Sequence, residues 1–479
     1  MRPHIIFRYN GFVLLFNALF LLISALISAL YSDNGLYPLL YSFIVVALFG
    51  AFPMIFVPPT TEISNKEGFV IVTSSWLLSC LVGILPYILW GGEFTLANAW
   101  FESVSGYTTT GSTILTNIES LPPGLLFWRS STHWMGGIGI IIFVLSVLPS
   151  MGRIGMFLYR TEVSSLAADN FHYRTRKTLL ILVYVYLGLT LTQTISLLFC
   201  GMNLFDAITH SFGTIATGGF SPKNVGVAYY QSIPVEFVIM IFMILSGIHF
   251  GLLFSAITGK FEDLWQSSSL RYYILALLAG VVVVAICLYS TQHESLTVAF
   301  RHSAFQVISV GTSTGFATID TSIWPPFTQL LLIFFTLQCA CAGSTSGGIK
   351  ADRMVILWNA IIKRLKKLQH PSGVFVARIN GVIIDDDTLE ASILYICIYL
   401  GVVFVSTLLL TVFGLDILSA FSGSAAAMGN VGPGFGIVGS MSNYSLIPEA
   451  GKWVLSATML LGRLEIFGLI LFFMVRWWK

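Results

Sequence analysis

The sequence has very little charge. Only 10% of its 479 residues are Asp, Glu, Lys or Arg, whereas 56% are hydrophobic and the mean hydropathy is +0.85. A soluble protein of this length would carry about 25% charged residues. Apolar runs of roughly 20 residues, long enough to cross about 30 Å of hydrocarbon, recur along the whole chain. The sequence therefore predicts an all-α polytopic membrane protein.

Enzyme signatures are also absent. The sequence contains no H-E-x-x-H, no G-x-S-x-G and no phosphate-binding P-loop, and its eight histidines lack the spacing of a zinc site. An intramembrane enzyme is therefore the remote alternative, and we expect no catalytic residue and no organic cofactor on this chain. The six cysteines lie in or beside apolar runs, which favours packing over disulfides. The basic residues lie between apolar runs, so a net charge of +2 does not indicate nucleic-acid binding.

What the sequence does contain is a repeated unit. Two apolar runs come first, at residues 11–31 and 38–57. A long run, a shorter half-hydrophobic segment ending near a glycine, and a second long run then recur four times. The long runs lie at 69–90 and 125–149, 178–200 and 234–257, 272–290 and 327–342, and 390–413 and 453–475. The short segments, at 96–110, 204–217, 299–314 and 418–431, are too short to span and are typical of re-entrant helices.

This pattern predicts ten full spans and six regions. The regions are two N-terminal transmembrane helices in 1–60, pore repeats in 61–152, 153–262 and 263–352, a basic cytoplasmic linker in 353–388, and a fourth repeat in 389–479. Nineteen Lys and Arg fall on the side of the termini and four on the other, so the positive-inside rule predicts cytoplasmic termini. The basic insert 350–371 could be a positive-inside anchor or a docking surface for lipid headgroups or a cytosolic partner.

The four short segments end in related sequences, "SVSGYTTTGST", "HSFGTIATGGF", "VISVGTSTGFA" and "SAAAMGNVGPG". Aligned on Gly111, Gly218, Gly315 and Gly432, they lie 107, 97 and 117 residues apart, which indicates fourfold internal repetition. Thr precedes the glycine in three copies and Val431 in the fourth, so a side-chain hydroxyl is not required there. The common functional part is therefore the backbone.

Extended backbone at membrane depth is tolerated where it lines a water-filled path, and rings of carbonyl oxygens can replace the hydration shell of a cation. We expect a pseudo-fourfold pore for a monovalent cation, because neutral dipoles suit such an ion better than a ring of carboxylates. The expected carbonyl ligands are Thr109, Thr110, Gly111, Ala216, Thr217, Gly218, Ser313, Thr314, Gly315, Asn430, Val431 and Gly432.

Two further features interrupt apolar runs. The first, "AGSTSGGIK", contains Gly343, Ser344, Thr345, Ser346, Gly347 and Gly348. It could be the capped end of a span or a flexible loop across the pore. The second is Arg463 with Glu465, charges that are costly inside a span. Arg463 could pair with a carboxylate of another span or hold the loop by its carbonyls. Glu102 and Asp206, on re-entrant segments, could compensate helix dipoles or attract cations at the outer mouth.

The four glycine segments, "CAGSTSGGIK" and "GRLEIF" together resemble the Trk/Ktr/HKT superfamily of cation transporters, and the two leading spans resemble its TrkH branch. The resemblance implies K+ as the transported and filter-bound ion, a gate made by Gly343 to Gly348 with Arg463, a homodimer, the bacterial inner membrane, and a cytosolic NAD- or ATP-binding regulatory subunit of the TrkA type. In plant relatives, Ser at the first filter glycine accompanies sodium selectivity, so Gly111 favours potassium. Sodium or non-selective transport is the alternative, and channel-like transport or symport stays open.

Overall fold

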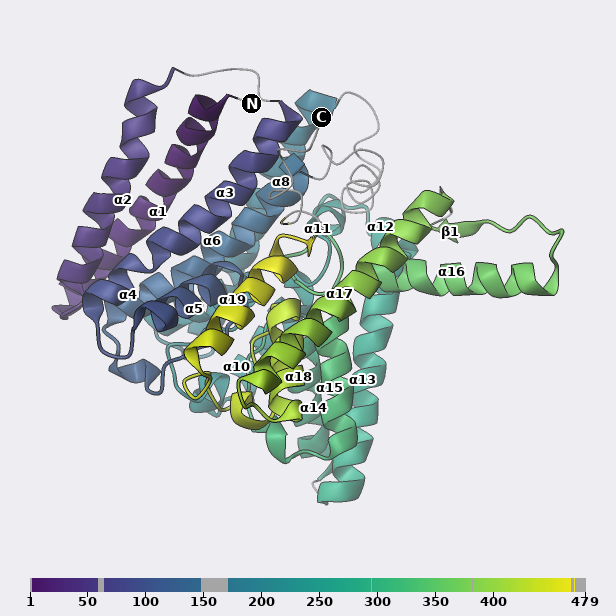
Figure 1. The fold of residues 1–479 in the computed structure, drawn as a ribbon. Helices are drawn as coiled ribbons and strands as arrows, with labels where there is room; N and C mark the ends of the chain where they lie inside the picture. The colour runs from purple at the N-terminus through teal and green to yellow at the C-terminus, as the bar shows by residue number, and fades with distance from the viewer. Residues whose placement is uncertain are drawn as a thin grey trace.

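The structure, a computed structural model, describes residues 2–58, 64–147, 171–293, 295–380, 382–466 and 469. Helices form a bundle from which one helix projects (Figure 1). The helices of the first half are α1 (Pro3–Tyr31), α2 (Leu36–Phe56), α3 (Asn65–Gly83), α4 (Leu85–Trp90), α5 (Leu96–Tyr107), α6 (Pro123–Val147), α8 (Phe171–Phe199) and α9 (Leu204–Ile215). Those of the second half are α10 (Ile233–Ser246), α11 (Phe250–Ile257), α12 (Glu262–Gln266), α13 (Ser268–Gln292), α14 (Leu296–Gly311), α15 (Pro326–Gln338), α16 (Ala351–Gln369), α17 (Asp386–Val412), α18 (Ile417–Gly429) and α19 (Glu449–Arg463).

The four expected re-entrant segments are the short helices α5, α9, α14 and α18. Each begins at a polar N-cap whose side chain accepts a hydrogen bond from a backbone N–H of the first turn, which satisfies a donor that the helix itself cannot. The caps are Thr95, Asn203, Ser295 and Asp416. At Asp416, hydrogen bonds from the Ser419 side chain and backbone N–H hold the pKa of the carboxyl below its usual range.

Packing between the repeats follows one cyclic order. Each re-entrant helix packs against the long helix before it, as α5 does on α3 and α9 on α8. The helix after it then contacts the re-entrant helix of the next repeat: α6 contacts α9, α10 contacts α14, and α15 contacts α18. The order closes because α19, in the fourth repeat, contacts α5 in the first. The four re-entrant helices are therefore surrounded by the long helices.

Within the described ranges, six helices are long and apolar enough to cross a membrane, or seven if α10 and α11 count as one bent span. Ten full spans therefore stay a prediction. The chain at 148–170, which includes the expected boundary between the first two repeats, and the chain beyond 469 lie outside the described residues.

The long run expected at 234–257 is bent, because α10 and α11 meet at 105° around His249. The physical reason is that backbone groups freed at this bend have other partners. The carbonyl of Gly247 accepts from the Cys341 N–H at 3.1 Å, and the Phe250 N–H donates to the Gly343 carbonyl at 3.1 Å. His249 caps α11 by accepting from the Gly251 N–H.

Breaks at a similar depth recur in the last two repeats. The helices α10, α15 and α19 end after 14, 13 and 15 residues respectively. The expected run 327–342 therefore stops early, at Gln338, and the expected run 453–475 is interrupted after Arg463, where Glu465 has a φ of +49°. In the first repeat, α6 continues as a helix past the corresponding point.

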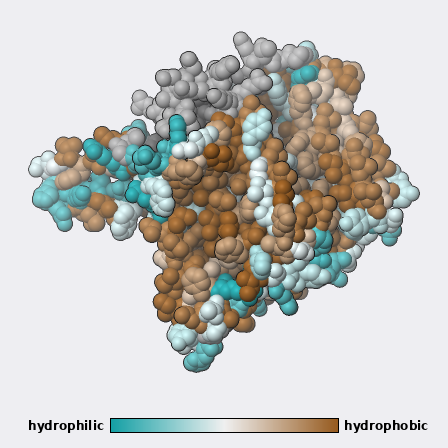
Figure 2. All heavy atoms as spheres, turned by 180° about the vertical axis from the view of Figure 1, so that it is seen from behind, coloured by the Kyte–Doolittle hydropathy of each residue, from teal (hydrophilic) through white to brown (hydrophobic). Residues whose placement is uncertain are grey.

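The basic insert forms α16, which projects from the bundle beside a short hairpin (Figure 1). The hairpin pairs β1 (Ala377–Ile379) antiparallel with β2 (Val382–Ile384), and Ala377 and Ile384 pack with Ile356 of α16 in a small separate core. Figure 2 shows a broad hydrophobic surface over the bundle, with hydrophilic residues gathered on the projection and along the opposite margin. This distribution is typical of a protein embedded in lipid.

Candidate functional site

Each re-entrant helix ends in the same turn. Its first residue has a left-handed backbone with φ of 52°, 53°, 58° and 52° at Thr109, Thr217, Ser313 and Asn430. The next residue donates its N–H to the carbonyl five residues earlier at 2.9, 2.7, 2.8 and 2.9 Å, from Thr110, Gly218, Thr314 and Val431. The third residue is a glycine with φ of 81°, 79°, 78° and 101°, at Gly111, Gly219, Gly315 and Gly432.

The turn geometry corrects the alignment of the second repeat. Gly218 was expected to match Gly111, but it occupies the position of Thr110, and Gly219 has the positive φ. The sequence could not distinguish these adjacent glycines, because only the backbone conformation separates them. The expected set that began at Ala216 therefore shifts by one residue, to Thr217, Gly218 and Gly219. The residue before the turn glycine carries a hydroxyl in only two copies, which strengthens the inference that the backbone is the common part.

The four turns contact one another in a closed ring. A Cβ placed on Gly111 would lie 2.0 Å from the carbonyl oxygen of Gly218 in the second repeat. The next three contacts, in order, are Gly219 with the Thr314 oxygen at 2.1 Å, Gly315 with the Val431 oxygen at 1.9 Å, and Gly432 with the Thr110 oxygen at 2.6 Å. Each glycine is thus required twice, for its positive φ and because the carbonyl of the next repeat occupies the space of a side chain.

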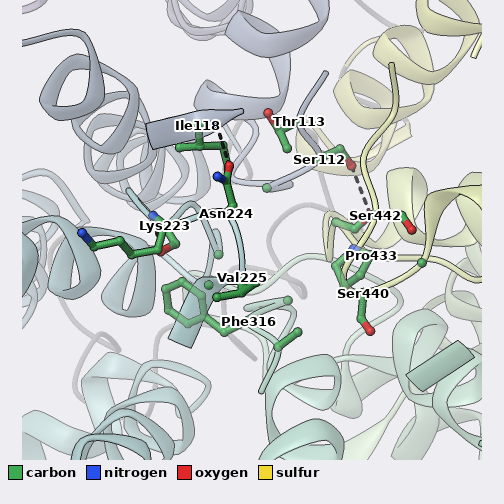
Figure 3. A pocket seen from close by; sticks show the side chains of 18 of the residues that line it. Ser112, Thr113, Ile118, Lys223, Asn224, Val225, Phe316, Pro433, Ser440 and Ser442 are labelled. Carbon is green, nitrogen blue, oxygen red and sulfur yellow. Dashed lines mark hydrogen bonds between the residues drawn. The ribbon is translucent and has the colours of Figure 1, made fainter. Parts of the chain in front are cut away.

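A pocket opens on the glycine side of this ring. It holds about 580 Å³, open solvent included, and all four turn glycines line it. Its other lining groups include the hydroxyls of Ser112, Ser440 and Ser442, with Lys223 directed away from them (Figure 3). The lining residues in the described part of the chain include no carboxylate. A cation in this pocket would meet neutral oxygens, although the positively charged Arg129 and Lys223 also belong to the lining.

Glu102 does not serve either role considered from the sequence. It lies in the second half of α5 rather than at its N-terminus, is fully buried, and forms an ion pair with Arg129 of α6 at 2.6 Å. Its carboxylate also accepts from the Ile114 N–H, just after the first turn, while Arg129 donates to the Ser221 carbonyl after the second. This pair therefore braces two neighbouring turns.

Asp206, by contrast, lies in the first turn of α9, where a carboxylate favours the helix dipole. Its N–H bonds the Asn203 cap, its carboxylate accepts from Tyr230, and Lys223 lies 3.8 Å away. Dipole compensation is the interpretation that this geometry supports.

Residues 339–350 form a buried loop between α15 and α16. Thr345 is fully buried, and its hydroxyl donates to the carbonyl of Ile215, the last residue of α9, at 2.9 Å. A Cβ on Gly347 would lie 2.4 Å from the Gly429 carbonyl at the end of α18. The loop thus lies against the helix-end side of the turns, while the pocket lies on the glycine side. The helix α16 begins directly after the loop, at Ala351, and the role of the loop as a gate stays a prediction.

Arg463 contacts this loop directly. It is almost fully buried, and it donates to the carbonyls of Thr345 at 2.7 Å and of Gly136 in α6 at 3.3 Å. In the described part of the chain it forms no ion pair, so the alternative of a structural pair with a carboxylate is not supported. This contact corresponds to one of the two alternatives considered from the sequence, and its role in gating stays a prediction.

Glu465 instead pairs with the far end of the loop. Its two carboxylate oxygens accept from Lys350 at 3.1 Å and from Arg353 at 2.6 Å, and all three side chains are buried. The guanidinium of Arg353 also lies 3.8 Å above the Tyr395 ring. Lys350 is therefore not the exposed cytoplasmic charge that its place in the sequence indicated.

The profile of the TrkH family, described as a cation transport protein, matches residues 39–477. The chain belongs to the TrkH family. It is 35% identical to the Trk system potassium uptake protein TrkH of Escherichia coli K12, over the full length of both chains. It is 32% identical to TrkH of Halomonas elongata, again over both full lengths. The crystal structure of the potassium transporter TrkH from Vibrio parahaemolyticus superposes with a TM-score of 0.89 at 32% identity, covering 98% of each chain. The family is one of transport proteins, not of enzymes.

In this TrkH-family chain, sequence reasoning missed two groups at the site. One is the brace of Glu102 and Arg129, and the other is the hydrogen bonding of the Ser313 hydroxyl to the loop. A charged pair of opposite sign within apolar segments was a usable signal for the first, since a lone intramembrane charge seeks a partner. No signal marked Ser313, because the sequence does not say which filter turn faces the loop.

Proposed function

We propose that this TrkH-family chain takes up potassium across the bacterial inner membrane through a pseudo-fourfold pore formed within one chain. The observation that carries the proposal is the closed ring of contacts among the four turns. In each turn, the carbonyl of the residue before the glycine lies against the turn glycine of the preceding repeat. The relatives named as potassium uptake proteins support the choice of ion. The proposal keeps the division expected from the sequence, with two leading helices in 1–60 and four repeats in 61–152, 153–262, 263–352 and 389–479.

The filter would consist of the backbone carbonyls of the four turns, with the second set read as Thr217, Gly218 and Gly219. Carbonyl dipoles can replace the water lost by a K+ ion. The four re-entrant helices end at these turns, so the partial negative charges of their C-termini favour a cation as well. Among the described residues, no group of three or more His, Cys, Asp or Glu could hold a metal ion.

The gate would be the buried loop, with Gly343 to Gly348 at its centre. Thr345 joins the loop to α9 through its hydroxyl and to Arg463 through its carbonyl. Arg463 would hold the loop closed and add a positive charge below the filter, which opposes cation entry. Opening would require these hydrogen bonds to break.

The remaining features rest on the family resemblance. We propose a homodimer, cytoplasmic termini, and a cytosolic NAD- or ATP-binding regulatory subunit of the TrkA type. The projecting helix α16 continues directly from the gate loop and is basic at its end, with Lys363, Arg364, Lys366 and Lys367, which suits a cytoplasmic contact. Whether the ion moves as in a channel or by symport is a separate question for flux measurements.

The test is rubidium-86 uptake into liposomes that contain the purified protein, with unlabelled K+ and Na+ as competitors. Uptake that K+ suppresses at much lower concentration than Na+ would support the proposal. Equal competition would favour a non-selective cation pathway, and stronger competition by Na+ would favour sodium transport. Absence of uptake in vesicles with correctly folded protein would reject the pore.

A further inference from the structure

One filter turn is hydrogen-bonded directly to the gate loop. The Ser313 hydroxyl lies 2.9 Å from the Ser346 hydroxyl and accepts from the Gly347 N–H at 3.1 Å. Ser313 is fully buried and Ser346 is almost so. Neither hydroxyl can exchange this partner for water without a movement of the loop.

The three equivalent turn residues are arranged differently. Thr109 Oγ1 has no hydrogen-bond partner in the described structure, and Thr217 Oγ1 bonds the carbonyl of its own neighbour, Ala216. Asn430 donates from Nδ2 to Thr110 Oγ1 and to the Met459 carbonyl, both at 3.0 Å. Each turn begins with one of these four residues. In the described structure, Ser313 is the one of the four whose side chain is hydrogen-bonded to the loop.

We propose that Ser313 couples the gate to the filter, so that the loop in its closed position holds the third turn in its selective geometry. This inference rests on the proposed function of the turns as filter and of the loop as gate. Ser313 has φ of +58°, a conformation that a residue other than glycine keeps only when its surroundings hold it. The hydrogen bonds to Ser346 and Gly347 are part of those surroundings.

The coupling has two consequences. When the loop leaves, the Ser313 hydroxyl loses both partners, and the third turn becomes free to relax, which lowers discrimination between K+ and Na+. Because coupling between two sites is reciprocal, K+ in the filter should in turn favour the closed loop. Ser313 acts here as a positioning residue, since it is its backbone, not its hydroxyl, that would face the ion.

The experiment measures rubidium-86 uptake and its suppression by K+ and by Na+ in five variants: Ser313→Ala, Ser346→Ala, the double variant, Ser313→Thr and Ser303→Ala. Ser303 is the control, because it is buried in α14, the helix that leads into the third turn, and in the described structure its hydroxyl bonds only the helix carbonyls of Ala299 and Phe300. Thr is chosen for the conservative variant because Thr109 and Thr217 adopt the same backbone conformation.

We expect Na+ to compete two- to tenfold better in Ser313→Ala and Ser346→Ala, the range that corresponds to one buried hydrogen bond. The double variant should change less than the sum of the two single variants, because both remove the pairing of the Ser313 and Ser346 hydroxyls. In addition, Ser313→Ala removes the acceptor of the Gly347 N–H, and Ser346→Ala removes that of the Ala340 N–H. Ser313→Thr should stay near the wild type. Unchanged competition in Ser313→Ala overturns the inference. So does an equal change in Ser303→Ala, or an additive change in the double variant.

The experiment can still test the coupling if one variant fails to fold, and it separates the coupling from the proposed function. If Ser313→Ala does not fold, Ser346→Ala decides alone, because it leaves the filter turn unaltered. A wild-type protein that does not take up rubidium selectively rejects the proposed function, whereas a selective wild type with unaffected variants rejects only the coupling.

Discussion

The guanidinium of Arg463 donates a hydrogen bond to the carbonyl oxygen of Thr345, 118 residues earlier in the chain, at 2.7 Å. Through this bond the last described helix holds the middle of the loop between α15 and α16. A second donor of the same guanidinium reaches Gly136 of α6. The first, third and fourth repeats therefore meet at the Arg463 side chain. The second repeat joins them through the Thr345 hydroxyl, which donates a hydrogen bond to the Ile215 carbonyl.

Replacing Arg463 with Ala should raise the rate of rubidium uptake. The change removes two hydrogen bonds from a charged donor and one buried positive charge, and such bonds contribute about 1.5–3 kcal/mol each. One such bond corresponds to an increase in the open population of up to about 100-fold. The measurement is uptake per folded protein in liposomes, with Lys363→Ala as control, since Lys363 is also a cation but its partner Asp386 is largely exposed. Lower uptake with intact selectivity would argue against a closing role for Arg463.

The corrected alignment of the second repeat leads to a comparison between two neighbouring glycines. A Cβ at Gly219 would meet the main-chain oxygen of Thr314 at 2.1 Å and require a φ of +79°, whereas a Cβ at Gly218 would meet the His133 ring at 2.6 Å. A side chain can move more readily than a carbonyl of the ring. Gly219→Ala should therefore impair K+ over Na+ discrimination more than Gly218→Ala, as measured by competition against rubidium uptake. The opposite ranking would restore the alignment on Gly218.

Several parts of this site could be predicted from the sequence because they depend on local composition. Short apolar segments ending in glycine predicted the short helices α5, α9, α14 and α18, and a run of Gly, Ser and Thr within an apolar stretch predicted the break after Gln338. The cost of an intramembrane charge predicted that Arg463 would have a specific partner. These expectations required no knowledge of which segments meet in space.

Other parts depend on tertiary contacts that a single sequence does not encode locally. The bend at His249 lacks a proline, and it is stabilised by hydrogen bonds with the distant residues Cys341 and Gly343. The adjacent Gly218 and Gly219 are equivalent by composition, and only the ring of carbonyls selects between them. The ion pair between Glu102 of α5 and Arg129 of α6 likewise depends on how the two helices pack, which their separate sequences do not specify.

Replacing Gly111 with Ser should reduce discrimination between K+ and Na+. The Ser Cβ would lie 2.0 Å from the Gly218 carbonyl oxygen, so either this carbonyl or the first turn must move. Because a displaced carbonyl no longer matches its neighbours around the ion, the preference for K+ should fall. Competition by Na+ against rubidium uptake measures the change. Gly201→Ser is a suitable control, because Gly201 also has a positive φ, at 88°, but nothing lies within 4 Å of its Cβ position. An unaltered preference in Gly111→Ser would count heavily against the filter assignment.

The buried cluster at Glu465 makes a separate prediction about stability. Replacing Glu465 with Gln leaves Lys350 and Arg353 without their shared carboxylate in a buried setting, and breaking a buried pair in this way costs about 3–5 kcal/mol. We expect a clearly lower thermal unfolding temperature in detergent. Asp386→Asn is the matched control, because it neutralises an acid whose ion pair with Lys363 is exposed, and it should change the unfolding temperature little. Since Lys350 ends the gate loop and Arg353 lies in the first turn of α16, Glu465→Gln should also raise rubidium uptake while the pore remains folded. A variant that loses stability but keeps wild-type uptake would show that the cluster stabilises the fold without holding the loop.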